Sequence, residues 1–147
     1  MHRYANPENN AVLREADGAI IPCDAANSDY AALLAQGETI APFRRFPDKT
    51  QAIAALVAAI KAECRRRILL IADEDRQRNL TARGVELTLA VAQGSLSQAD
   101  ATELADLQAL WGRIKALRSA SDAKEAGLEV LPLEALEGYA LEQGWPE

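Results

Sequence analysis

No proline occurs between residues 48 and 131, and this gap constrains the fold more than any other feature of the chain. Proline removes a backbone donor and disrupts helix interiors, so its absence permits long helices. Apolar residues early in this stretch recur every three or four positions, which is the spacing of one helical face. That stripe consists of Ile53, Val57, Ile60, Cys64, Ile68 and Ile71. With only 5% aromatic residues, the composition also favours slender helical packing.

Charged residues interrupt the stripe at positions 73–78, and it resumes at Ala82, Val85, Leu89 and Ala92. Charged residues of this kind are good helix formers, so one interpretation is a continuous helix over residues 50–93. Such a helix would be roughly 65 Å long at about 1.5 Å per residue. The other interpretation is a break at residues 73–78, and the sequence leaves both open.

Residues 94–97 are predicted to form a tight turn into a second, antiparallel helix. Gly94 suits the end of the first helix, and Ser97 followed by Asp100 is a variant of the capping box. The second helix is expected to end near residues 119–122 or to continue to Gly127. Its apolar residues are Leu104, Leu107, Trp111, Ile114 and Leu117.

The position of the turn predicts the register of this helical hairpin. With a turn centred near residue 95, Leu107 lies opposite Gly84 and Trp111 lies opposite Leu80. Glycine costs about 1 kcal/mol relative to alanine inside a helix. We interpret Gly84 as making room for the two large side chains.

The same register brings Arg118 near Asp73, and Lys115 near Glu74 and Asp75. We therefore expect a belt of charge between the two helices. Exposed ion pairs contribute only ~0–1 kcal/mol each, so this belt would set register more than stability.

The N-terminal part is predicted to be a small β-hairpin head. Asp17-Gly18 separates two short apolar runs, and this dipeptide is a strong hairpin signal. Residues 1–10 are expected to be a loosely held arm. A short helix follows, capped by Asp24 or Asn27 and ended by Gly37.

The predicted fold is mainly α: a small β-hairpin head, a long antiparallel helical hairpin and a short C-terminal helix starting near Pro132. The expected parts are residues 1–47 (head and proline-containing connector), 48–127 (helical hairpin) and 128–147 (C-terminal helix and tail). The second helix is too short in this prediction to cover residues 50–64 of the first.

An uncovered apolar surface usually marks an interface, so we expect partner binding at that end of the first helix and on the head. Trp145 is a third candidate, because an aromatic side chain near the end of a chain can anchor a partner. The alternative, that it packs on its own helix, is the one we favour. The candidate partner-binding residues are Ile20, Ile21, Tyr30, Ile53, Leu56, Val57, Ile60 and Trp145.

The sequence gives no sign of enzyme chemistry. His2 is the only histidine, and Cys23 and Cys64 lie far apart, so we expect no catalytic residue, no metal site and no cofactor. The net charge of −6 disfavours nucleic acid as a partner. The longest apolar run, residues 52–60, is much shorter than the ~20 residues that span a bilayer, so no membrane association is expected.

Residues 17–37, DGAIIPCDAANSDYAALLAQG, resemble the opening "DGxxIPxDxxNxDYxxYLxWxxxG" of small bacteriophage tail proteins. The tryptophan that follows Leu34 in that pattern is absent here. Residues 67–121 resemble the helical hairpin of phage tail-fibre assembly proteins, with Leu107, Trp111 and Ile114 in an "L-x-x-W-x-x-[YI]" pattern. The Gly-Trp-Pro at residues 144–146 is similar to the "DWP" endings of the same group.

The resemblance implies a viral tail-fibre assembly chaperone or accessory protein that acts in the host cytoplasm during assembly. Its partner would be a phage tail-fibre or baseplate protein, and a second copy of the chain is a further candidate partner. The alternative that the resemblance implies is a structural component of the virion tail, at the baseplate or the fibre attachment region.

Overall fold

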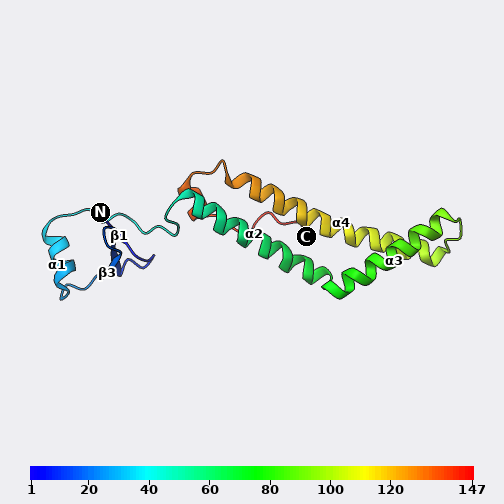
Figure 1. Cartoon of the computed structure of the whole chain (residues 1–147), viewed down its shortest axis with the longest axis horizontal. Coiled ribbons are helices and arrows are strands. Elements are labelled where there is room, and N and C mark those ends of the chain that lie inside the picture. The colour runs from blue at the N-terminus through cyan, green and yellow to red at the C-terminus, as the bar shows by residue number, and fades with distance from the viewer. The chain divides into compact units, whose positions relative to one another are not determined.

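The computed structural model describes all residues, 1–147, and divides them into two compact units, Met1–Ala52 and Ile53–Glu147. The predicted fold class is confirmed, since a small antiparallel sheet is followed by long helices (Figure 1). The first unit holds β1 (His2–Tyr4), β2 (Ala11–Arg14), β3 (Ala19–Pro22) and α1 (Ser28–Ala35). The helices that follow are α2 (Lys49–Ile71), α3 (Glu74–Ala92), α4 (Gln98–Leu128) and α5 (Leu133–Glu137).

The head is a three-stranded sheet rather than a hairpin. The predicted pair is present as β2 and β3, and Gly18 takes the positive φ of 74° that the turn between them requires. The expectation that residues 1–10 form a loose arm was wrong, because β1 pairs with β2 on one side. On its other side Tyr4 N–H donates to Ala41 O, and Ala41 N–H donates to His2 O, both at 2.9 Å.

The sheet and α1 share one small core. Asn27 is the N-cap of α1, and its side chain accepts from the backbone N–H groups of Asp29 and Tyr30. This decides between the two predicted caps in favour of Asn27. The buried residues of the core are Val12, Ile21 and Leu33, with Tyr4, Cys23, Tyr30 and Ile40 packed around them.

The first long helix is broken between α2 and α3, which settles the question that the sequence left open. Asp73 leaves the helical conformation and its carboxylate accepts from Arg76 N–H at 2.7 Å, so it caps α3. At the end of α2, Gln77 Nε2 donates to Ala72 O at 2.7 Å. Both helix ends are therefore capped by side chains, as exposed ends require. Glu74, in the first turn of α3, adds favourable negative charge at the helix N-terminus.

The predicted charge belt was wrong in its partners. Glu74 pairs with Arg65 across the break at 2.5 Å, and Asp75 pairs with Arg78 within α3. Neither Lys115 nor Arg118 forms an ion pair. Because the helix breaks here, the carboxylates are used for capping and for local pairs instead of for contacts with α4.

The turn between α3 and α4 forms as predicted. Gly94 has a φ of 67°, and Ser97 Oγ accepts from Asp100 N–H at 3.1 Å. The Ser97 hydroxyl also donates to the Asp100 carboxylate at 2.6 Å. The expected register is confirmed at Gly84, where a Cβ would lie 4.0 Å from Leu107 Cδ2. That distance is an ordinary contact, so the space does not require glycine.

The expectation that α4 is too short to cover α2 was wrong. α4 continues to Leu128, because nothing in residues 119–127 stops it, and Gly127 lies within the helix. Leu56 and Ile60 are consequently buried, with 3% and 0% of their surface exposed. Lys61 and Glu125 form an ion pair at 3.4 Å, which places the end of α4 beside the middle of α2. Figure 1 shows the two helices side by side.

Candidate protein-binding groove

The second unit has a closed end and an open end. The closed end comprises α2, the C-terminal half of α4 and the tail, and its core consists of Cys64, Ile68, Ile114 and Leu117. The open end comprises α3 and the N-terminal half of α4, including the turn between them. At the closed end Cys64 Sγ donates to Leu117 O at 3.6 Å, so its thiol is a buried structural group.

Trp145 belongs to the closed end. Its indole packs against the core there, and its N–H donates to Leu141 O at 2.8 Å. Arg67 and Lys124 lie over the ring at 5.3 and 5.2 Å from its centroid, which is cation–π distance. The tail is thus fastened to α2 and α4 by its own tryptophan.

Glu63 supplies the strongest electrostatic feature of the closed end. Its carboxylate accepts from Arg66 at 2.6–2.7 Å and from Arg67 at 2.6 Å, and only 7% of the side chain is exposed. Hydrogen bonds from Arg66, and then from Arg67, lower the pKa of Glu63 to about 2. Arg67 also reaches Glu142 at 3.0 Å, which ties the tail to the same cluster.

The residues predicted to bind a partner are mostly used inside the protein. Ile21, like Leu56 and Ile60, is buried, and Tyr30 packs on the head core. Ile53 and Val57 are half-buried. Ile20 differs from them, with 67% of its surface exposed. The eight residues are divided between the two units, with Ile20, Ile21 and Tyr30 in the first and the other five in the second.

The open end carries a feature that the sequence analysis did not identify. A groove of about 710 Å³ runs between α3 and α4. No charged side chain lines it. The lining residues are Leu80, Thr81, Gly84, Val85, Thr88, Leu89, Ala92, Leu104, Leu107, Gln108 and Trp111.

The threonines of the groove do not make it polar. Thr81 Oγ1 donates to Gln77 O at 2.8 Å, and Thr88 Oγ1 donates to Gly84 O at 2.7 Å. Their hydroxyl donors are therefore satisfied within α3. A partner would meet a largely apolar surface with few polar groups to match.

Two aliphatic side chains on α3 border the groove and are open to solvent. Val85 is 66% exposed and Leu89 is 56% exposed, and a spacing of four residues places them on one face of the helix. Leu87, by contrast, is 1% exposed and faces the interior of the hairpin. The apolar residues of α3 thus exceed what α4 alone can bury.

A second set of contacts between α3 and α4 is ionic. Arg83 reaches Asp100 at 2.7 Å and Glu103 at 2.8 Å, both on α4, and Glu86 at 3.2 Å on its own helix. The hydrogen bond from Arg83 lowers the pKa of Glu103, while the Ser97 hydroxyl is the main cause of the lowered pKa of Asp100. None of these five residues lines the groove, so charge is kept away from its walls.

The only histidine of the chain lies in the head. His2 Nδ1 lies 2.5 Å from Glu38 Oε2, and a cavity beside His2 also includes Arg14 and Asp29. No serine, threonine, cysteine or lysine lines that cavity. No group of three or more His, Cys, Asp or Glu side chains is placed to hold a metal ion. No helix has the length and apolar character that crossing a membrane requires.

Comparisons with protein-family models, with curated proteins and with solved structures find no match to this chain.

The sequence did contain a signal for the groove. Val85 and Leu89 belong to the stripe that resumes after residues 73–78, and Leu80 and Trp111 were placed opposite each other by the register. What the spacing could not reveal is that nothing covers them. That depends on where the tail packs, and its Trp145 packs against the core of the closed end.

Proposed function

We propose that this protein binds an apolar helix of another protein in the groove of the open end, and that it acts as a non-enzymatic phage tail-fibre assembly chaperone or accessory protein. The observation that carries the proposal is the uncharged groove of about 710 Å³ with Val85 and Leu89 exposed at its border. Contiguous apolar surface of this kind is typical of protein interaction sites.

The physical reason for binding is an incomplete layer. Stable domains bury each apolar helix stripe against a second layer of structure, and the open end has only α3 and α4. Full burial of a valine or leucine side chain contributes about 1.5–3 kcal/mol. Val85 and Leu89 are more than half exposed, so covering them supplies roughly 1–2 kcal/mol each.

The geometry favours a helix as the bound segment. Helices pack by placing the ridge of one into the groove between two others, as amphipathic target helices do in helix-in-groove recognition. The groove follows α3 from Leu80 to Ala92, which is about 18 Å at 1.5 Å per residue. A partner helix would therefore present about three turns of apolar side chains.

The choice of a tail fibre as the partner comes from the resemblance of residues 17–37 and 67–121 to phage tail proteins. An assembly chaperone would cover apolar surface of a fibre chain before the fibre is complete, and it would act in the host cytoplasm. In this proposal the head, with Ile20 exposed, provides a second contact.

The direct test is co-purification of the full chain with the tail-fibre protein of the same virus, using Val85→Asp and Leu89→Asp. A buried charge in an apolar interface is costly, so we expect at least a tenfold loss of binding. Val130→Asp is the matched control, because Val130 is 83% exposed and lines no described cavity. Equal binding by the groove variants and the control would contradict the proposal.

Two other outcomes have defined meanings. If Val85→Asp changes the sedimentation of the isolated protein from a dimer to a monomer, the occupant is a second copy of the chain. If mass spectrometry finds the protein in stoichiometric amounts in purified particles, the structural virion component is favoured over the chaperone.

A further inference from the structure

A second cavity in the same unit has a different chemical character from the groove. It has a volume of about 450 Å³ and is lined by apolar side chains, by three arginines and by Glu147. We call the arginines the rim and the aliphatic residues the floor, which consists of Leu70, Ile71, Leu110 and Leu117. Leu70 is 74% exposed, although it follows the well-buried Ile68 by only two positions in α2.

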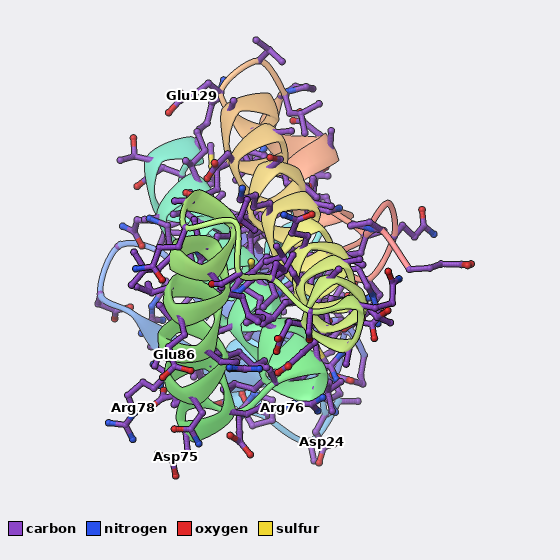
Figure 2. All side chains as sticks on the ribbon, turned by 90° about the vertical axis from the view of Figure 1, so that its right-hand side faces the viewer. Asp24, Asp75, Arg76, Arg78, Glu86 and Glu129 are labelled. Carbon is purple, nitrogen blue, oxygen red and sulfur yellow. The ribbon has the colours of Figure 1, made fainter.

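Two of the rim arginines lack a carboxylate partner. The Arg113 side chain forms no hydrogen bond or ion pair, and the Arg76 guanidinium makes only a long contact of 3.5 Å with Ile71 O. Arg67, the third, is already held by Glu63 and Glu142. Figure 2 labels Arg76 on the side of α3 nearer to α4, whereas Asp75 and Arg78 project from the opposite side.

Most arginines of the second unit are in ion pairs, although Arg118 is a further exception. The chain's 22 acidic residues outnumber its 16 basic residues, and Arg65, Arg66 and Arg83 are among the paired arginines. Glu147 lines the same cavity and still forms no ion pair with Arg76 or Arg113. An unpaired guanidinium beside exposed leucine has unused hydrogen-bond donors that match carboxylates well.

We infer that this cavity is a docking site for an acidic peptide segment of a partner protein, one that carries an aliphatic side chain between carboxylates. The aliphatic side chain would cover Leu70 and Leu110, and carboxylates on either side of it would pair with Arg76 and Arg113. The charge of the rim selects acidic partners, and the floor selects against segments that are only acidic. This site does not depend on the groove, and the two surfaces can be tested apart.

The probe is the synthetic peptide acetyl-EDLLED-amide, titrated into the ¹⁵N-labelled full chain and followed by amide NMR spectra. We expect shifts concentrated at Leu70, Ile71, Leu110 and Arg113. The uncharged peptide acetyl-QNLLQN-amide should bind about fivefold more weakly, since a rim ion pair contributes up to ~1 kcal/mol. Raising the salt concentration should weaken only the acidic peptide.

Arg113→Glu is expected to weaken peptide binding at least about fivefold, whereas Lys115→Glu should leave binding unchanged. Lys115 is exposed on the same helix, makes no ion pair and lines no described cavity, so Lys115→Glu reverses a charge outside the proposed site. Leu70→Ser leaves all charges in place, and it too should weaken binding. Both positions are exposed, so neither variant is expected to unfold the protein.

Val85→Asp separates this site from the groove. Peptide binding that survives Val85→Asp and is weakened in Arg113→Glu supports the inference, whatever the outcome for the tail fibre. The inference is overturned if the neutral peptide binds equally well, if Arg113→Glu binds like the native chain, or if the shifts fall on residues 80–92 instead.

Discussion

The closed end and the open end of the second unit are built from the same kind of helix, but only the closed end is covered by a third segment. At the closed end the tail adds a third segment over α2 and α4, and Trp145 fixes it there. At the open end α3 and α4 pack on each other alone, and the groove stays uncovered. The spacing of apolar residues determines which face of a helix is apolar. The number of segments that cover this face decides whether it becomes core or stays exposed.

The largest expected difference between the two ends is in stability. Ile114 is 0% exposed in the closed core, so Ile114→Ala should lower the free energy of unfolding by about 2–5 kcal/mol. Val85→Ala at the open end should change it by about 0.5 kcal/mol or less, because Val85 is exposed. Urea denaturation measures both. Similar losses for the two variants would show that Val85 is covered in solution.

A smaller effect is expected at the break that separates the ends. Asp73 caps α3, and removing such a cap costs about 1 kcal/mol, so Asp73→Ala should lower stability by that amount. The loss should appear as faster amide hydrogen exchange in the first turn of α3, with the closed core unaffected. Asp75→Ala is the control, because Asp75 pairs only with the exposed Arg78.

Gly84→Ala tests whether the floor of the groove is kept open at the expense of stability. A Cβ there meets Leu107 Cδ2 at 4.0 Å, an ordinary contact, so alanine fits. Replacing a helical glycine should raise the free energy of unfolding by roughly 0.5–1 kcal/mol. The same methyl group partly fills the groove, so partner binding should weaken. A more stable variant that binds equally well would exclude Gly84 from the interface.

The last prediction concerns the pH dependence of stability. The pKa of Glu63 is about 2 in the folded chain and 4.5 as its ordinary value, so its ion pairs contribute stability above pH 4.5. That contribution is lost progressively as the pH falls from 4.5 to about 2. The difference in thermal midpoint between the native chain and Glu63→Gln should therefore narrow over this range. A constant difference would contradict the assigned pKa.

Much of the fold could be predicted because its determinants are local. Turn glycines, helix caps such as Ser97 and the three-to-four spacing act over a few residues, and they placed the turn at Gly94 and the contact between Leu107 and Gly84. The break at Asp73 was also local, but its acidic run was compatible with a helix interior as well as with a cap and first turn.

The rest depended on contacts that are distant in sequence. β1 exists because it pairs with β2 on one side and with Ala41 on the other, and no pattern within residues 1–10 predicts these pairings. The prediction of an interface at Leu56 and Ile60 depended on where α4 ends. The spacing of apolar residues cannot predict that end when no stop signal is present. The open groove was missed for the same reason, since it is defined by the absence of a covering segment.

The capped break at Asp73 has a consequence for how this protein can vary. In a continuous helix, one inserted residue rotates every side chain beyond it by about 100°. Between two helices that end and begin on their own caps, an insertion is absorbed by the connection. An insertion at this connection therefore leaves the register of the closed core unchanged. The sequence and position of α3 can vary while the packing of α2 at the closed end is preserved.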